Sequence, residues 1–129
     1  MKIIDYHSLS MGEKFTSKFI ITEELIKDYV DALADPHPPG KVPNYLFLNF
    51  APIYEAFDGR LSPGTLQIKQ KIEFYQEALV GDEINVTATI KGKYRKNERD
   101  YFIYEVDFLK DNELVCKHVS THLWDFLSK

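Results

Sequence analysis

The segment from Asp35 to Gly40, with the sequence DPHPPG, places a carboxyl group and an imidazole two residues apart. These are the groups that most often carry protons in enzyme reactions, and an imidazole titrates close to neutral pH. In an extended, proline-rich segment we expect the side chains of Asp35 and His37 to diverge. Two interpretations stay open: a catalytic pair, or a helix-terminal aspartate followed by a solvated loop histidine.

A second group of chemically versatile residues lies near the end of the chain, where His118, Ser120 and His122 alternate with other residues. On a strand these side chains point to one side, together with Cys116 and Trp124. Strand residues four apart lie roughly 13 Å from each other, too far for both imidazoles to bind one metal ion. No Gly-x-Ser-x-Gly nucleophile motif is present. We expect no metal here, but a polar or subunit-facing sheet surface.

A basic cluster occupies residues 91–99, with the sequence KGKYRKNER. If this segment is a strand, Lys91, Lys93 and Arg95 share one face. The cluster fits a solvated hairpin tip, or a patch that binds phosphate groups or an acidic partner. Tyr94 and Tyr101 flank it and would be able to stack on a nucleotide base.

The overall composition indicates one globular domain over residues 1–129, with 44% hydrophobic and 28% charged residues. The net charge of −4 gives no support to nucleic-acid binding. Cys116 is the only cysteine, so an internal disulfide is impossible and a reducing compartment is expected; its side chain is interpreted as a small buried hydrophobe. With no signal-peptide core and no apolar run of membrane-spanning length, the sequence predicts a soluble cytoplasmic protein.

The first part of the chain predicts a strand and a helix. Residues 15–21 alternate loosely, as a short strand does. Thr22 is a good N-cap for a helix whose apolar residues recur at helical spacing. This helix should end near Ala34 or Asp35, because a residue before proline avoids the α region.

A second helix is predicted from Pro43 to Phe57. Apolar residues occur on nearly every side, which indicates a buried helix. Pro52 predicts a kink or break within it, and the pair Asp58-Gly59 predicts its end.

The remainder predicts strands over residues 66–77, 84–96, 101–110 and 113–126, separated by turns over 78–83, 97–100 and 111–112. The residues of 66–77 alternate strictly, so every second side chain should lie on one face of the strand: Leu66, Ile68, Gln70, Ile72 and Phe74. Three hairpin-linked long strands suggest an antiparallel meander. The expected fold class is α+β, a curved antiparallel sheet wrapped around a long central helix.

This layout resembles the hot-dog fold. The stretch FIITEELIKDYVDALADPHP is similar to the opening of MaoC-like hydratase/dehydratase domains, T-x-E-x-I-x-x-Y/F-A-x-A-x-x-D-x-N-P-x-H. IEFYQEALVGDEINVTATI resembles that family's F-x-x-P-x-x-x-G-D-x-L-x-V-x-A-x-I, with Gly81 and Asp82 at a turn. VPNYLFLNF is similar to the A-P-P-T-F start of the central helix in the amino-terminal dehydratase-like subgroup. The resemblance covers roughly residues 15–124.

The resemblance implies a hydro-lyase of the (R)-specific type, which hydrates 2-enoyl thioesters or dehydrates 3-hydroxyacyl thioesters of coenzyme A or acyl carrier protein. Asp35 would be the carboxyl acid/base. His37 stands where the family has Asn, and Gly40 stands where it has the catalytic His. The loop from Gly40 to Pro43 is shortened. His37 would therefore be a displaced base, or the site is degraded and the chain is not an enzyme.

Other roles also follow from the resemblance. It implies two groups of substrate-binding residues. Pro43, Asn44 and Tyr45 would lie at the start of the central helix. The basic residues Lys91, Lys93 and Arg95 would face the phosphates of coenzyme A or a carrier protein. The residues for an acyl tunnel, or alternatively for plain core, are Tyr45, Leu48, Phe50 and Tyr54. No metal or cofactor is expected.

Two further interpretations stay open. In one, the chain is the non-catalytic, acyl-binding or pocket-shaping subunit of a heterodimeric dehydratase and pairs with a His-bearing homologue. If the chain does not form such a heterodimer, a homodimer is expected. The other alternative is a hot-dog acyl-CoA thioesterase, for which Glu55 is the one carboxylate available on the central helix.

Overall fold

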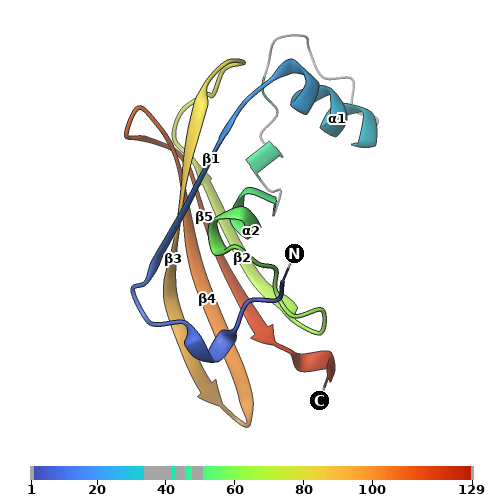
Figure 1. Ribbon diagram of the computed structural model, residues 1–129, viewed down its shortest axis with the longest axis vertical. Coiled ribbons are helices and arrows are strands. Elements are labelled where there is room, and N and C mark those ends of the chain that lie inside the picture. The colour runs from blue at the N-terminus through green and yellow to red at the C-terminus, as the bar shows by residue number, and fades with distance from the viewer. Residues whose placement is uncertain (1, 34–41, 43–45, 48–50, 129) are drawn as a thin grey trace.

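The structure is a computed structural model, which describes residues 2–33, 42, 46–47 and 51–128. Within these residues five strands form one antiparallel sheet in the order β1-β3-β4-β5-β2. The strands are β1 (Lys14–Ile20), β2 (Leu66–Phe74), β3 (Glu83–Lys96), β4 (Arg99–Lys110) and β5 (Glu113–Trp124), and the helices are α1 (Glu23–Leu33) and α2 (Ala51–Phe57). The long strands curve, with α2 on their concave side and α1 beyond the end of β1 (Figure 1). This is the α+β hot-dog arrangement that the sequence predicts.

The predicted meander of β3, β4 and β5 is confirmed, and two tight turns connect it. Asn97 and Glu98 have φ values of 52° and 64°, and Asp111 and Asn112 have 50° and 63°. Two consecutive left-handed residues are typical of the type I′ turn, whose twist matches that of the flanking strands. These turn conformations therefore allow β3 to pair with β4, and β4 to pair with β5, as tight hairpins.

The Gly81-Asp82 turn is also confirmed and joins the strand system to the end of β1. Gly81 adopts a φ of 94°, a region that favours glycine. The Asp82 carboxylate accepts a hydrogen bond from the Leu79 N–H (2.6 Å) and pairs with Lys110 (3.0 Å). The Asp82 carbonyl accepts from the N–H of Ile21 (2.9 Å), which fixes the chain where β1 leads into α1.

Both helix boundaries that the structure describes have a local cause. The Leu25 N–H donates to Thr22 Oγ1 (3.0 Å), as predicted for an N-cap. At the end of α2, Asp58 has a φ of 52° and the Gly59 N–H donates to the Tyr54 carbonyl (3.0 Å). This is a Schellman-type C-cap, so the predicted end at Asp58-Gly59 is confirmed. The expected end of the first helix at Ala34 or Asp35 lies outside the described residues.

The helix α2 is seven residues long, and Pro52 lies in its first turn. Most of the predicted segment from Pro43 to residue 50 lies outside the described residues, so the expected length of the central helix stays a prediction. Ser17 Oγ of β1 donates to the Pro52 carbonyl (2.8 Å). The Phe57 ring packs 4.9 Å from that of Phe15 on β1. These contacts hold α2 against the concave side of the sheet.

The hydrophobic core lies between α2 and the concave face. The inward residues of β3 and β4 in this core are each 0% exposed: Ile84, Val86, Ala88, Ile90, Phe102, Tyr104, Val106 and Phe108. The residues between them on β4 are half-buried and lie on the convex face. The strict alternation of β4 therefore matches its two environments.

Three shifts of register interrupt the pairing of the described strands. They leave Lys91 of β3, Ile68 of β2 and Val115 of β5 without a paired residue. Each extra residue reverses which side chains face the core beyond it. The predicted single face of residues 66–74 is therefore wrong: Leu66 and Ile68 do not share a face with Gln70, Ile72 and Phe74.

Among the described helices, none is both long and apolar enough to cross a membrane.

Candidate functional site

A row of polar side chains runs along the inner face of β5. His118 and Ser120 are 0% exposed and His122 is 2% exposed. In the sheet they lie opposite Val106, Tyr104 and Phe102 of β4, which belong to the core. The prediction that the three polar residues share one face is confirmed. The prediction of a polar sheet surface is wrong, because these three residues are buried within the chain itself.

The irregularity at Val115 explains this orientation. Lys110 pairs with Glu113 across the tight turn, and a regular hairpin would then place Lys117 opposite Val106. The extra residue shifts the pairing, so His118 lies opposite Val106 instead. The histidines and Ser120 turn toward the core, and Lys117 turns toward the convex face.

The irregularity at Ile68 has a matching effect on β2. Gln67 lies opposite His122, and Gln70 lies opposite Ser120. Residues three apart on a regular strand face opposite sides, but the extra residue lets both glutamines face inward. Gln67 Nε2 donates to Ser120 Oγ (2.7 Å), and Gln70 Nε2 lies 2.8 Å from His118 Nε2. An edge strand thus supplies partners for the buried polar row.

A hydrogen-bond chain links three of these residues. Gln67 donates to Ser120 Oγ, which leaves the Ser120 proton for His122 Nε2, 2.8 Å away. His122 Nε2 is then the acceptor, which places the ring proton of the neutral imidazole on Nδ1. Burial, with a smaller effect of His118, lowers the pKa of His122 to about 4. Burial also lowers the pKa of His118. Both rings are therefore neutral at pH 7.

Tyr104 extends the row on β4. Its ring is stacked on that of His122, with centroids 5.3 Å apart and planes 7° from parallel. Burial raises the pKa of the Tyr104 phenol far above its usual range, and Ser120 acts weakly in the opposite direction. In the described part of the chain, no group meets hydrogen-bond geometry with the Tyr104 hydroxyl.

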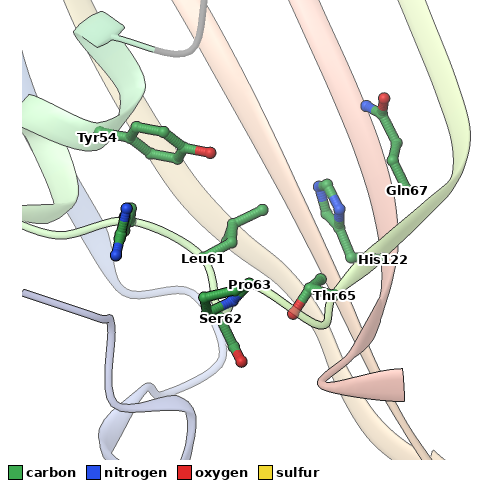
Figure 2. Close-up of a pocket in the computed structure, with 8 residues that line it drawn as sticks. Tyr54, Leu61, Ser62, Pro63, Thr65, Gln67 and His122 are labelled. Carbon is green, nitrogen blue, oxygen red and sulfur yellow. The ribbon is translucent and has the colours of Figure 1, made fainter. Parts of the chain in front are cut away.

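The row opens into a pocket of about 410 Å³ below α2. The described residues that line it are Tyr54, Arg60, Leu61, Ser62, Pro63, Thr65, Gln67 and His122. Figure 2 shows Tyr54 and Leu61 on one side of this space, and His122 and Gln67 on the other. The pocket therefore lies between α2, the loop of residues 60–65 and the inner faces of β5 and β2.

The loop of residues 60–65 is held at both ends. The Arg60 carbonyl accepts from the Ile4 N–H (2.9 Å) of the N-terminal segment. Ser62 Oγ donates to Asp125 Oδ1 (2.6 Å), and the Asp125 N–H donates to Thr65 Oγ1 (3.0 Å). These bonds fix the wall of the pocket that faces β5.

Chemically, this arrangement suits hydrogen bonding better than nucleophilic catalysis. Ser120 is fully buried, and the His122 imidazole that it contacts has its basicity reduced by burial. A serine nucleophile needs an accessible hydroxyl and a base near neutral pKa. No group of three or more His, Cys, Asp or Glu side chains able to hold a metal occurs in the described ranges.

The predicted catalytic and helix-start residues fall outside the described residues. These are Asp35, His37, Pro43, Asn44 and Tyr45. Leu48 and Phe50, proposed for an acyl tunnel, also fall outside, but Tyr54 lines the pocket. Their roles stay predictions.

The three basic residues predicted for phosphate binding do not form one patch. Lys91 pairs with Glu105 on the convex face (3.0 Å), whereas Lys93 donates to the Leu9 carbonyl (2.9 Å). Lys93 also lies 4.9 Å from the centre of the Tyr6 ring, on the concave side. Arg95 pairs with Asp100 across the hairpin (2.9 Å). The predicted common face is wrong because the extra residue Lys91 reverses the alternation, while substrate binding by these residues stays a prediction.

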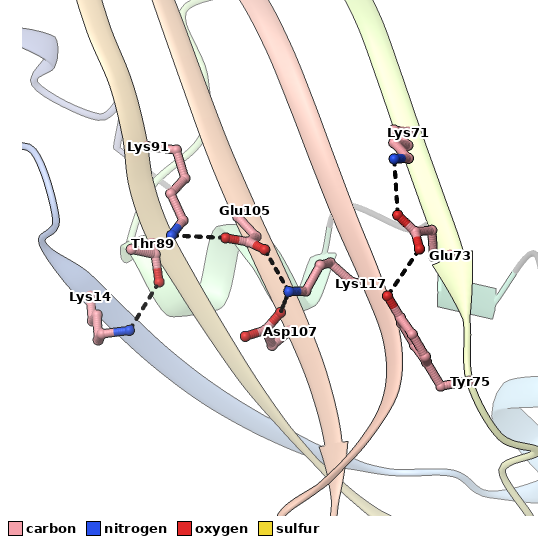
Figure 3. Close-up of polar contacts among 9 residues, drawn as sticks. All are labelled: Lys14, Lys71, Glu73, Tyr75, Thr89, Lys91, Glu105, Asp107 and Lys117. Atoms are coloured by element: carbon pink, nitrogen blue, oxygen red, sulfur yellow. Dashed lines mark hydrogen bonds and ion pairs between the residues drawn. The ribbon is translucent and has the colours of Figure 1, made fainter.

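The convex face carries a ladder of ion pairs, drawn in Figure 3. Glu105 accepts from both Lys91 (3.0 Å) and Lys117 (2.8 Å), and Lys117 lies 3.9 Å from Asp107. Glu105 and Asp107 thus lie on the face opposite to the histidines of β5. Nearby, Tyr94 and Tyr101 stack on each other at 4.8 Å.

Sequence reasoning missed several residues of the pocket wall: Arg60, Leu61, Ser62, Pro63, Thr65 and, beside it, Tyr104. Loop residues carry no periodic signal, so nothing in the pattern marks them. Tyr104 lies among apolar neighbours on β4 and is indistinguishable from core in the sequence. A signal for the inner row did exist, since polar residues recur with period two in residues 116–124.

Comparison with solved structures identifies the fold. The MaoC-like dehydratase from Rhodospirillum rubrum matches with a TM-score of 0.72 at 14% identity, over 92% of this chain and 94% of that one. The (R)-hydratase PhaJ1 from Pseudomonas aeruginosa gives 0.73 at 20% identity, over 95% and 86%. The HadBC (3R)-hydroxyacyl-ACP dehydratase complex from Mycobacterium tuberculosis gives 0.68 at 18% identity, over 88% and 96%.

The chain therefore has the hot-dog fold that these solved structures share. No protein-family model matches its sequence. No curated protein matches it either.

Proposed function

We propose that this protein acts on acyl thioesters as an (R)-specific hydratase or dehydratase of the MaoC-like type. The substrate would be a 2-enoyl or 3-hydroxyacyl thioester of coenzyme A or acyl carrier protein. The observation that carries the proposal is the match of nearly the whole chain to an (R)-hydratase, at a TM-score of 0.73. The order of the motifs, from Thr22 through Asp35 to Gly81-Asp82, supports it independently.

In this proposal Asp35 and His37 divide the proton transfers. For hydration, the Asp35 carboxylate accepts a proton from water as its oxygen adds to C3 of the enoyl group. The His37 imidazolium donates a proton to C2, beside the carbonyl. Dehydration reverses both transfers. The N–H groups at the start of the central helix, near Pro43, Asn44 and Tyr45, would stabilise the negative charge that develops on the thioester oxygen.

Fold alone does not choose among activities, because the hot-dog fold also hosts thioesterases. For that chemistry the candidate carboxylate is Glu55 on α2. Its side chain is exposed and is not among the residues that line the described pocket. This favours the hydratase over the thioesterase.

The test is hydration of crotonyl-coenzyme A by the purified protein, followed as loss of enoyl absorbance. We expect turnover that Asp35→Asn abolishes and Glu55→Gln preserves, because Glu55 lies on another element. A parallel assay for free thiol separates the alternatives. Thiol release that depends on Glu55 would replace the hydratase proposal with a thioesterase.

A second candidate function is favoured by the residue at one position. Gly40 stands where the family has its catalytic histidine, which suits a pocket-shaping subunit that relies on a His-bearing homologue. Co-expression with such a homologue should then give a stable heterodimer that hydrates the enoyl thioester when neither chain does so alone. Turnover by the purified single chain would exclude this candidate.

Assembly and location form part of the same proposal. We propose a dimer in a reducing, cytoplasmic environment; the single cysteine, which leaves no internal disulfide to form, supports the second point. Burial raises the pKa of Cys116 to about 12, so the thiol is unreactive in the folded protein. Light scattering of the purified protein would measure the assembly.

A further inference from the structure

The pocket below α2 presents both donors and acceptors of hydrogen bonds. Ser62 donates its proton to Asp125, so its oxygen remains able to accept. Thr65 Oγ1 accepts from the Asp125 N–H, and its own hydroxyl proton remains able to donate. Gln67 uses one N–H toward Ser120 and keeps its amide oxygen. With the Nδ1–H of His122 and the second N–H of Gln67, these four side chains offer three donors and two acceptors.

Apart from Arg60, the described residues that line this pocket are uncharged at neutral pH. His122 is neutral, and Gln67, Thr65 and Ser62 do not ionise in the physiological range. Arg60 is the one charged side chain among the described lining residues, and it is exposed. A carboxylate or ammonium placed beside His122 would therefore lose its hydration without a buried counter-charge. An uncharged polar group would exchange hydration for protein hydrogen bonds.

A purely hydrocarbon ligand fits the lining poorly. It would displace water from Gln67, Thr65 and His122 and leave these groups without partners, which costs more than a hydrogen bond gains. Apolar surface comes from Leu61, Pro63 and the ring of Tyr54, which suits the carbon chain of a ligand that ends in a polar group.

We propose that this pocket binds an uncharged ligand group that both donates and accepts hydrogen bonds, and that the acyl chain of the thioester is preferred when it carries a hydroxyl far from the thioester. The second part rests on the proposed function, and the first does not. The residues that select the hydroxyl are Gln67, Thr65 and His122, with Ser120 as a positioning residue that orients the Gln67 amide and fixes the His122 tautomer.

The experiment compares two ligands that differ by one hydroxyl, 6-hydroxyhexanoyl-coenzyme A and hexanoyl-coenzyme A, by calorimetric titration. We expect the hydroxylated thioester to bind roughly tenfold more tightly. Placing the hydroxyl at carbon 6 keeps it apart from the 3-hydroxyl of a hydratase product. Equal affinities, or a preference for the hydrocarbon chain, would overturn the inference.

A second pair of probes separates this inference from the proposed function. The free amides 6-hydroxyhexanamide and hexanamide differ in the same way but contain no thioester. Shifts in the amide NMR spectrum of the ¹⁵N-labelled protein should locate the hydroxylated amide at Gln67, Thr65 and His122. If the amide binds there while thioesters neither bind nor react, the assignment of the pocket is supported and the proposed function is wrong. If the amides do not bind at these residues, the pocket assignment is wrong.

Variants locate the preference within the pocket. Gln67→Leu changes an exposed edge-strand residue that folding tolerates, and should reduce the preference to about twofold or less. Gln70→Leu is the matched control, because it removes an amide from the same inward face of β2 but does not line the pocket. A preference that survives Gln67→Leu and His122→Phe would place the hydroxyl elsewhere and overturn the assignment.

Discussion

Polar side chains on the two faces of the sheet differ in burial and in charge. On the concave face, His118, Ser120 and His122 are buried and neutral; hydrogen bonds from β2 reach Ser120 and His118, and Ser120 in turn bonds His122. On the convex face, Glu105 and Lys117 are ionised and form a ladder that water reaches (Figure 3). The comparison teaches that a charge on this sheet needs water or an opposite charge nearby, and that the buried row of His118, Ser120 and His122 has neither in the described part of the chain.

The concave face also differs in what it has available for a ligand. The convex pairs satisfy each other, and Lys91 of the predicted phosphate site already binds Glu105. The buried row instead borders a pocket at His122, and polar groups that line this pocket still have hydrogen-bond donors and acceptors without a protein partner among the described residues. A ligand therefore gains more from the buried neutral row than from the exposed charged ladder.

The largest expected effect comes from forcing a charge into the concave face. Ser120→Asp buries a carboxylate among neutral groups and should reduce the free energy of unfolding by more than about 3 kcal/mol. Thr121→Asp is the control, because the next residue lies half-buried on the convex face and should cost less than about 1 kcal/mol. Urea denaturation measures both. Similar losses for the two variants would show that the faces do not differ.

The next effect is the pH dependence that the buried histidines impose. The pKa of His122 is about 4 in the folded state, below its value of about 6.5 in an unfolded chain. The unfolded state therefore binds more protons between these values, so stability falls as the pH is lowered from 7. His122 alone should account for a loss of about 2 kcal/mol between pH 7 and pH 5.

His122→Gln tests this assignment, because it removes the titrating group and keeps a polar side chain. Denaturation measured at pH 7, 6 and 5 should show a flatter dependence in the variant. His7→Gln is the matched control, because His7 is exposed and lies outside the buried row. If the stability of His122→Gln depended on pH as steeply as that of the wild-type protein, His122 would not be the buried neutral group described above.

The smallest effect is expected on the convex face. The hydrogen bond from Lys117, together with Lys91, lowers the pKa of Glu105, so its contribution to stability is lost as the pH falls below about 4.5. At neutral pH, Glu105→Gln should cost about 1 kcal/mol or less, since both lysines remain partly exposed. The loss should shrink further in 1 M salt. A loss larger than that of Ser120→Asp would reverse the comparison.

Much of the secondary structure follows from residues close together in the sequence. Thr22 caps α1 through its own hydroxyl, Gly81 adopts the turn conformation that a glycine permits, and Asp58-Gly59 closes α2. The alternation of β4 predicts its buried face because that strand is regular throughout. These features depend on contacts within a few residues, which the sequence displays directly.

The tertiary structure alone decided which side chains the concave face contains. The extra residues Ile68, Lys91 and Val115 appear only when strands pair, because each is defined by the register with a neighbour. A shift of one residue exchanges the two faces of a strand, so a period-two pattern cannot locate it. The sequence by itself determined the strands, the turns and the types of side chain available. The pairing of β2, β4 and β5 decided that the exposed glutamines of β2 reach the buried histidines and Ser120 of β5 beside a pocket.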